Sequence, residues 1–313
     1  MYCRGMLSAL LLIGVQPDAT LTRIKAEAAS MRVVCQTPVA AEFLKGADDL
    51  TAPAPRPIYY REKDRQLSSV PGEGFEPTPL TSALYYDTKY GTPLAYARVI
   101  EAAGRHGFKT LKGKRVLDIG YGTVGHLRLM ALAGAGAVGV DVDPFLVQLY
   151  SHSSDQGAFG AGKVQMVDGS WPEDAKVAKS VGKDFDLITS KNTLKRGYVH
   201  PERKVDPRML VDLGVSDEKY LAAVHSALRP GGYFVVYNLS PPQNPDPEKW
   251  IPWSDGRCAF TRDQLTKAGF RVLEYDQTED QVVARMAVAF GWAKSTAEAR
   301  AGFYSHVTVC RRR

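Results

Sequence analysis

Short runs rich in apolar and β-branched residues alternate with longer amphipathic stretches over most of the chain. Runs of about 4–8 such residues, bounded by turn-forming residues, are typical of buried strands. Seven runs fit this pattern, at residues 116–119, 137–140, 163–167, 185–190, 233–238, 270–275 and 306–310. Strands that alternate with helices predict a doubly wound α/β fold, in which a mainly parallel sheet carries helices on both faces.

The stretches between the runs carry signals for helix starts. Ser216 precedes two acidic residues, which is typical of an N-cap followed by carboxylates that the helix dipole favours. Two capping-box patterns, Thr261 with Gln264 and Thr278 with Gln281, predict two further helices near the C-terminus. These signals agree with the positions that the strand pattern leaves for helices.

A glycine-rich turn follows the first predicted strand. It reads GYGTVG at residues 120–125 and leads into a helix expected over 124–133. Gly120 and Gly122 allow the backbone to turn sharply and to approach a ligand closely. Asp141 stands at the end of the second strand, where a carboxylate can accept hydrogen bonds from both hydroxyls of a ribose. The sequence therefore predicts a nucleotide-type cofactor at this turn.

The glycine pattern alone also fits a NAD-dependent oxidoreductase on a Rossmann fold. Two further features separate the alternatives. Asp118 stands two residues before the first glycine, and Leu-Arg-Pro-Gly-Gly at 228–232 precedes the fifth strand. In both features the chain resembles the class I S-adenosylmethionine-dependent methyltransferases, over roughly residues 80–313. One departure is Val124 in place of a third glycine, with Gly125 following, and it keeps open a binding protein that has lost catalysis.

The resemblance implies a Rossmann-like methyltransferase fold of seven strands, with the last strand antiparallel beside the sixth. It implies S-adenosyl-L-methionine as the cofactor and methyl transfer to oxygen or nitrogen of a small organic acceptor. It places Asp118 near the methionine end of the cofactor, Asp141 on the ribose and Asp168 on the adenine amino group. Because tyrosine rings attract a sulfonium, Tyr90 is a further candidate. The other candidate cofactor contacts are Gly120, Tyr121, Gly122, Val142, Gly169 and Ser190.

Candidate catalytic residues follow the fourth strand, at the switch point where ligands bind in open α/β sheets. They are Lys191, Asn192, Tyr198 and His200. Methyl transfer depends mainly on alignment, and a base such as His200 is needed only if the acceptor keeps its proton at neutral pH. Trp250 and Trp253, in the loop after the fifth strand, are second-rank candidates for a wall of the acceptor site.

Composition narrows the remaining choices. The formal net charge is +6 over 313 residues, a mild basic bias that makes an RNA methyltransferase a weaker alternative and a nucleic-acid partner unlikely. The four cysteines are far apart and form no zinc-binding spacing, so we expect reduced thiols and no metal.

The first part of the chain reads as an extension. Residues 6–15 are apolar but too few to span a bilayer; they could form the core of a secretory signal with Ala26-Glu27-Ala28 as its cleavage pattern. We expect a cytoplasmic protein, with export as the alternative. The prolines at 52–57 predict a linker, and we place the boundary at Pro71-Gly72, giving an extension of residues 1–72 and a methyltransferase domain of 73–313.

Overall fold

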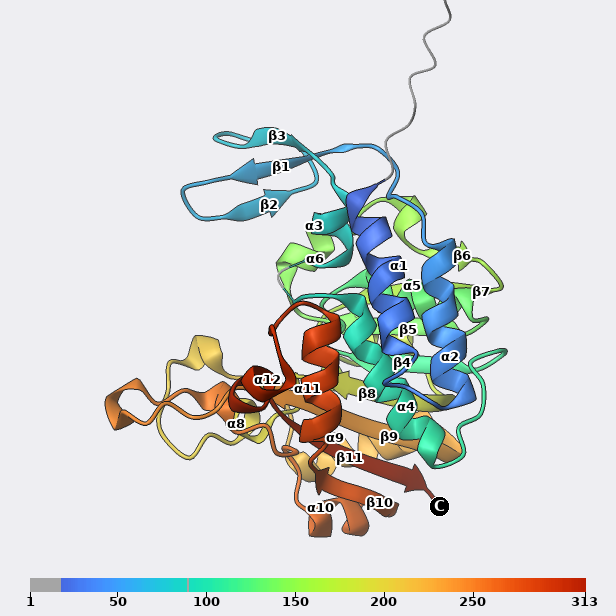
Figure 1. Ribbon diagram of the computed structural model, residues 1–313, viewed down its shortest axis with the longest axis vertical. Helices are drawn as coiled ribbons and strands as arrows, with labels where there is room; N and C mark the ends of the chain where they lie inside the picture. The colour runs from blue at the N-terminus through green and yellow to red at the C-terminus, as the bar shows by residue number, and fades with distance from the viewer. Residues whose placement is uncertain (1–17, 89) are drawn as a thin grey trace, which may run out of the picture.

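The computed structural model describes residues 18–88 and 90–313, and its centre is one sheet of eight strands. The strands are β4 (Arg115–Ile119), β5 (Gly136–Asp141), β6 (Gly157–Phe159), β7 (Gly162–Asp168), β8 (Phe185–Lys191), β9 (Leu228–Ser240), β10 (Phe270–Gln277) and β11 (Tyr304–Arg312). Their order across the sheet is β10-β11-β9-β8-β4-β5-β7-β6 (Figure 1). The five central strands, from β9 to β7, pair in parallel.

All seven predicted strands are present, and the sheet has one more. The additional strand is β6, three residues long, which pairs antiparallel with β7 at the edge of the sheet. It escaped prediction because so short a run carries no clear pattern. As expected, β11 is antiparallel to β10, and it lies between β10 and β9. The LRPGG segment begins β9, since the preceding helix already ends at Ala227.

Helices cover both faces of this sheet. Alternation along β4 sends Val116 into one hydrophobic core and Leu117 into the other. The first core is closed by α4 (Ala97–Arg105), α5 (Val124–Leu132), α6 (Pro144–Leu149) and α11 (Asp280–Ala289). The second core is closed by α7 (Ala175–Val181), α9 (Asp217–Ala227) and α10 (Arg262–Lys267). The doubly wound architecture is therefore confirmed.

The N-terminal extension adds an outer layer to the first core. Helix α2 (Pro38–Lys45) packs on α4 and α5, and α1 (Ala19–Met31) packs on α2 and α11. Ile24 and Phe43 are fully buried in the same core as Leu127. The Ala26-Glu27-Ala28 pattern lies inside α1, with Glu27 and Ala28 buried. Residues 6–15, the possible signal core, lie outside the described residues.

A small three-stranded sheet projects from this layer (Figure 1). It contains β1 (Pro57–Arg61), β2 (Gln66–Ser68) and β3 (Glu76–Pro79), in the order β2-β1-β3. The extended residues 51–56 lead into β1, and Pro71-Gly72 lies between β2 and β3. From β3 the chain returns to the body of the molecule through α3 (Ser82–Tyr86) and the 3-10 turn η2 (Pro93–Tyr96).

Helix signals were mostly reliable. Ser216 caps α9, and Thr261 with Gln264 forms the expected capping box on α10. The box at Thr278 was wrong: α11 starts after Glu279, which has no capping hydrogen bond because its carboxylate pairs with arginines. Helix α12 (Thr296–Gly302), which follows α11, was not predicted.

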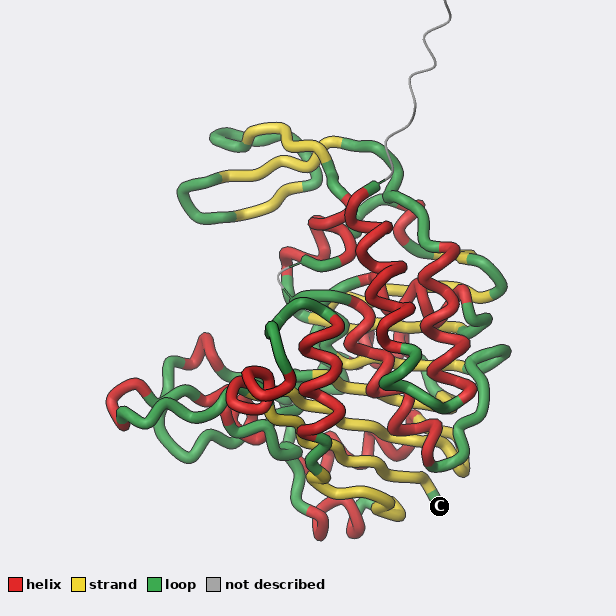
Figure 2. The backbone as a smooth tube through the Cα atoms, in the orientation of Figure 1, coloured by secondary structure: helices red, strands yellow, loops and turns green. Residues whose placement is uncertain are grey.

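Three further observations concern the chain as a whole. Cys35, Cys258 and Cys310 are buried free thiols, as expected. In the described part of the chain, no helix combines the length and hydrophobicity needed to cross a bilayer. Two connections project together past the carboxyl ends of the strands that precede them (Figures 1 and 2), one from β8 through α8 (Arg196–Val199) and η4 (Pro207–Met209), the other from β9 through η5 (Pro247–Lys249) and η6 (Pro252–Ser254).

Candidate functional site

A cavity of about 950 Å³ opens beyond the carboxyl ends of β4, β5 and β8. Its walls come from the loops that follow these strands, from the 90–96 segment and from residues 208–213 of the first projecting connection. β4 has β5 on one side and β8 on the other, and the connections leave in opposite directions at this switch point. The topology therefore opens a crevice at the position where the sequence predicted a ligand.

The glycine turn forms the cavity wall after β4. Gly120 and Gly122 have φ angles of +73° and +58°, which residues with a side chain rarely adopt. A Cβ at Gly120 would lie 2.1 Å from Thr193 Oγ1, and one at Gly122 would lie 3.0 Å from the Tyr90 ring. The turn therefore depends on both glycines. Tyr121, between them, also lines the cavity and is 5% exposed.

Asp141 fixes this turn against the end of β5. Its carboxylate accepts hydrogen bonds from the backbone N–H groups of Gly122 (3.0 Å), Val142 (2.8 Å) and Asp143 (3.1 Å). Burial raises the pKa of Asp141, while these three hydrogen bonds oppose the rise. Asp141 and Val142 both line the cavity, and the Tyr90 hydroxyl donates to Asp143 at 2.6 Å. A carboxylate is thus held at the cavity edge, ready for a hydroxyl-bearing ligand.

Asp118 lies behind the cavity wall and is fully buried. It accepts hydrogen bonds from Tyr96 Oη (2.8 Å) and Thr189 Oγ1 (2.6 Å), and His126 Nε2 lies 2.8 Å from its carboxylate. The His126 ring stacks on Tyr96 with centroids 3.5 Å apart. Asp118 is not among the lining residues, so the structure gives it internal partners where the sequence suggested a ligand contact.

Two other expected cofactor contacts also lie off the cavity wall. Asp168 is exposed and does not line the cavity, whereas Gly169 does, and the Gly169 N–H donates to the Asp141 carbonyl at 2.9 Å. Ser190 is fully buried, and its hydroxyl accepts from the Leu194 N–H. The residues that follow them in the chain, Gly169 and Lys191, line the cavity instead.

The candidate catalytic residues divide into two groups. Lys191, Asn192 and Tyr198 line the cavity. His200 does not: it is exposed, and its Nε2 lies 3.0 Å from Asp217 Oδ2 at the start of α9. We therefore remove His200 from the acceptor side, since its ring is occupied by a surface carboxylate.

Asn192 shapes the loop after β8. It has a φ angle of +64°, and its side-chain oxygen accepts the Leu239 N–H at 2.7 Å. Its own N–H donates to the Tyr237 carbonyl at 3.1 Å. Asn192 thus ties the end of β8 to β9 and turns the following residues into the cavity.

Lys191 is the cation at the end of β8. Its Nζ lies 5.3 Å from the centroid of the Tyr96 ring, a cation–π contact. Among the residues that the structure describes, this amine has no hydrogen-bonding or ion-pair partner. Burial lowers the pKa of Lys191 to about 8, although the Asp118 carboxylate acts in the opposite direction. An amine that loses its proton more readily than that of an ordinary lysine therefore lines the cavity.

Lys195 is a second lysine of this wall that the sequence analysis did not select. It is 4% exposed, and its Nζ donates to the carbonyl oxygens of Leu239 (2.5 Å) and Trp253 (3.5 Å). Burial lowers the pKa of Lys195 to about 7, and the charge of Lys191 adds to the effect. The Lys-x-x-x-Lys spacing directly after a buried strand was the signal that could have shown Lys195 together with Lys191.

The remaining wall is largely apolar and aromatic. From this group the sequence predicted Tyr198 and Trp253; Trp250 does not line the cavity, and the Arg203 guanidinium lies over its ring. The other members come from the loop after β7, from the first projecting connection and from α9, where no motif marks them. They are Trp171, Met209, Leu210, Val211, Leu213 and Tyr220.

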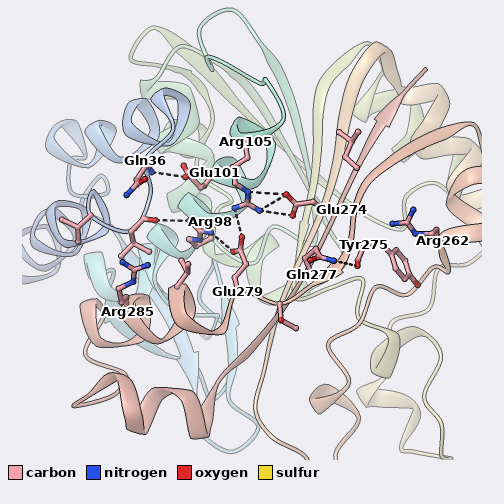
Figure 3. A pocket seen from close by; sticks show the side chains of 15 residues that line it. Gln36, Arg98, Glu101, Arg105, Arg262, Glu274, Tyr275, Gln277, Glu279 and Arg285 are labelled. Atoms are coloured by element: carbon pink, nitrogen blue, oxygen red, sulfur yellow. Dashed lines mark hydrogen bonds and ion pairs between the residues drawn. The ribbon is translucent and has the colours of Figure 1, made fainter.

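A second cavity, of about 620 Å³, lies between the α1–α2 connection, α4, β10 and α11 (Figure 3). Four of its charged groups pair with one another. Glu279 accepts from Arg98 and Arg105, each at 2.6 Å, and Arg105 also reaches Glu274 at 3.0 Å. Glu101 accepts the Gln36 N–H at 3.0 Å. The ion pairs join α4 to β10 and α11, and the hydrogen bond to Glu101 joins the α1–α2 connection to α4, so we assign this cavity a structural role.

Comparison with known protein families identifies the family of this chain. A family model described as a methyltransferase domain matches residues 110–278, which is more than half of the chain. No curated protein matches the sequence. The matched segment runs from just before β4 to the end of β10, and so contains the glycine turn, Asp141 and the loop after β8.

Two solved structures illustrate the similarity of fold. A candidate sarcosine dimethylglycine methyltransferase from Galdieria sulphuraria is 13% identical over 72% of this chain and 86% of its own, with a TM-score of 0.43. An S-adenosylmethionine-dependent methyltransferase from Mesorhizobium loti is 21% identical over 66% of this chain and 95% of its own, with a TM-score of 0.37. Because these scores are low, the assignment depends on the family match, by which this chain belongs to the methyltransferase-domain family and is an S-adenosylmethionine-dependent methyltransferase.

Proposed function

We propose that the enzyme transfers a methyl group to oxygen or nitrogen of a small organic acceptor that binds in the apolar half of the 950 Å³ cavity. The observation that carries this proposal is the division of the cavity walls. The glycine turn, Asp141 and residues 169–170 form a polar half at β4 and β5. Trp171, Trp253 and the aromatic and aliphatic side chains from 198–220 form the other half.

The polar half fits S-adenosylmethionine. Gly120 and Gly122, both with positive φ, let Thr193 and Tyr90 pack directly against the turn and bring its backbone to the cavity wall, where a ligand can approach it closely. Asp141 stands where it can accept hydrogen bonds from ribose hydroxyls, with Val142 beside it for the adenine ring. Gly169 and its neighbours would close the adenine end, and Tyr90 would cover the turn. When bound, the cofactor supplies an activated methyl group on a sulfonium.

The chain's own contribution is alignment and the exclusion of water. A displacement needs the acceptor atom about 3–3.5 Å from the methyl carbon, on the side opposite sulfur. Tyr198 and Trp253 would hold the acceptor body there, while residues 208–213 shield it from solvent. Asn192 would keep the β8 loop in the required shape through its contacts with β9.

The test is a pair of measurements on one preparation. Calorimetry should show binding of S-adenosylhomocysteine and no binding of NADH. Gly122→Val should weaken S-adenosylhomocysteine binding, because a side chain at this positive φ would press on the Tyr90 ring and distort the turn. Gly302→Ala is the matched control, since a Cβ at this position in α12 meets no atom within 4 Å. NADH binding without S-adenosylhomocysteine binding would contradict the proposal.

The acceptor itself can be found by labelling. The enzyme is incubated with isotopically labelled S-adenosylmethionine and a metabolite extract, and labelled products are identified by mass spectrometry. We expect a small organic product with an apolar body. Label appearing only in RNA would exclude the proposed acceptor class and favour the RNA methyltransferase alternative.

A further inference from the structure

Lys191 differs from the other charged groups of the cavity wall in having no polar partner among the described residues. Four carboxylate or guanidinium groups line the cavity, and each has a hydrogen-bonding or ion-pair partner. Asp141 accepts three backbone N–H groups, Asp143 accepts from Tyr90, Asp212 accepts from the Gly214 N–H, and Arg208 pairs with Asp206. Among the described residues, the amine of Lys191 contacts only the Tyr96 ring at this short range, so its lone pair is open to an acceptor in the cavity.

The surroundings of Lys191 favour its neutral form. The groups that face it are Asp118 from β4, the Tyr96 ring from η2, His126 from α5 and Lys195 from its own loop. Asp118 is the sole carboxylate among them, and its hydrogen bonds from Tyr96, Thr189 and His126 already stabilise its charge. A sulfonium bound nearby would add a further positive charge and would disfavour the ammonium still more.

We propose that Lys191 is the general base of the reaction, and that the acceptor is a phenolic or enolic hydroxyl on a flat apolar body; this inference depends on the function proposed above. The oxygen of the hydroxyl attacks the methyl carbon, forming an O–C bond. The C–S bond breaks and its electron pair stays on sulfur. The hydroxyl proton passes to the lone pair of Lys191 Nζ, and this amine thereby becomes a charged ammonium.

Matching of acidity and shape supports this class of acceptor. A base acts best on a proton whose pKa is close to its own, and the pKa of Lys191 is lowered to about 8. Phenols and enols come close to this value, whereas aliphatic alcohols are many units weaker acids. Trp253, Tyr198 and Trp171 offer planar surfaces against which a ring can pack. Lys195 cannot replace Lys191, because its amine is held by the carbonyls of Leu239 and Trp253.

The experiment uses the full chain and a series of para-substituted phenols of graded acidity, with benzoates and anilines as competing classes. S-adenosylhomocysteine formation is measured from pH 6 to 10. The wild type should methylate phenols with a kcat/KM that rises with pH to a plateau above about pH 8. Lys191→Met should lower kcat by about 100-fold or more, which is the contribution typical of a general base. In this variant kcat/KM should no longer rise with pH up to about pH 8. Its remaining activity should depend more steeply on phenol acidity.

Two controls separate chemistry from folding and from cofactor binding. Lys191→Met should bind S-adenosylhomocysteine within about twofold of the wild type, and Lys204→Met, an exposed lysine outside the cavity, should leave activity unchanged. Methylation of benzoates or anilines in place of phenols would overturn the inference but leave the proposed function intact. If kcat/KM of Lys191→Met rose with pH as it does in the wild type, the inference would also be overturned. Absence of S-adenosylhomocysteine binding in the wild type would instead overturn the proposed function.

Discussion

The two cavities of this enzyme treat buried charge in opposite ways. In the cavity of Figure 3, Arg98 is 3% exposed but lies 2.6 Å from Glu279, which also pairs with Arg105. In the cavity at the carboxyl ends of the strands, the amine of Lys191 contacts the Tyr96 ring and has no ion-pair partner among the described residues. Leaving a charge without a partner inside a protein is costly, whereas a paired charge is tolerated. The first arrangement holds elements together; the second keeps an amine reactive.

The difference also supports our choice of the carboxyl-end cavity as the proposed functional site. Volume and charge alone do not distinguish them, since both are lined by several titratable groups. What separates them is whether those groups are satisfied by one another. Strongly perturbed groups in a cleft are candidates for chemistry, and Lys191 and Lys195, whose pKa values fall to about 8 and about 7, both line the carboxyl-end cavity.

The largest expected effect comes from breaking the paired cavity. Arg98→Met leaves Glu279 with one arginine fewer and also removes a hydrogen bond to the Val34 carbonyl. Truncating one partner of a buried pair costs about 3 kcal/mol, so the free energy of unfolding should fall by that amount in urea titrations. Affinity for S-adenosylhomocysteine should stay within about twofold.

Arg32→Met is the control for this change. Arg32 pairs with Asp48 on the surface, where both side chains are about half exposed, and such pairs contribute less than about 1 kcal/mol. If Arg98→Met instead weakened S-adenosylhomocysteine tenfold without loss of stability, the second cavity would communicate with the first. The structural role that we assign to it would then be wrong.

The next effect concerns the cofactor half of the functional cavity. Asp141→Ala removes the proposed ribose contact and the hydrogen bond that holds the Gly122 N–H. Hydrogen bonds to a charged group contribute about 1.5–3 kcal/mol each, so the Kd for S-adenosylhomocysteine should rise by about 100-fold. Glu274→Gln, in the other cavity, should leave that Kd unchanged. Unchanged affinity in Asp141→Ala would remove the ribose assignment.

The sequence predicted the sheet well, because period and turn chemistry are local properties. All seven predicted strands, the capped helices α9 and α10 and the glycine turn are present. The error at Thr278 has a tertiary cause. The carboxylate of Glu279 is held by ion pairs with Arg98 and Arg105 of α4, which lies far earlier in the chain. No local pattern shows such a partner.

The site was less accessible to prediction for a similar reason. Sequence spacing located the crevice, but it shows neither the hydrogen bonds that bury Asp118 and Ser190 nor the exposed position of Asp168. All three were therefore chosen together with Gly120 and Asp141. The apolar wall comes from residues 208–213, a connection without regular pattern. His200 looked like a base by residue type, yet Asp217, which draws its ring to the surface, lies in the next helix.

Acid should weaken the region behind the functional cavity. Burial lowers the pKa of His126, while Asp118 opposes this effect. Unfolded histidine titrates near pH 6.5, so below that pH the unfolded chain binds a proton that the folded chain does not. The free energy of unfolding should therefore fall as pH drops below about 6.5, by up to about 1.4 kcal/mol per unit for this residue.

Urea titrations at pH 7.5 and pH 5.5 measure this loss. His126→Gln, which keeps an N–H group for Asp118, should show a smaller loss than the wild type, and His152→Gln, at an exposed site, should behave as the wild type does. An equal loss in His126→Gln would show that other groups dominate. The ion pairs of the second cavity involve arginine, which stays charged throughout this range, so Arg98→Met should not alter the acid dependence.

The smallest effect is expected at Tyr90, which is 48% exposed above the glycine turn. Tyr90→Phe removes the 2.6 Å hydrogen bond to Asp143 and keeps the ring. A hydrogen bond at so exposed a site is worth less than about 1 kcal/mol, so the Kd for S-adenosylhomocysteine should rise less than about fivefold. Tyr90→Ala also removes the ring and should have the larger effect, with a greater loss for the sulfonium form because the ring attracts a cation. Equal losses for S-adenosylmethionine and S-adenosylhomocysteine in Tyr90→Ala would show that the ring only covers the turn, and that the electrostatics of the cavity depend on Lys191 and Asp118 instead.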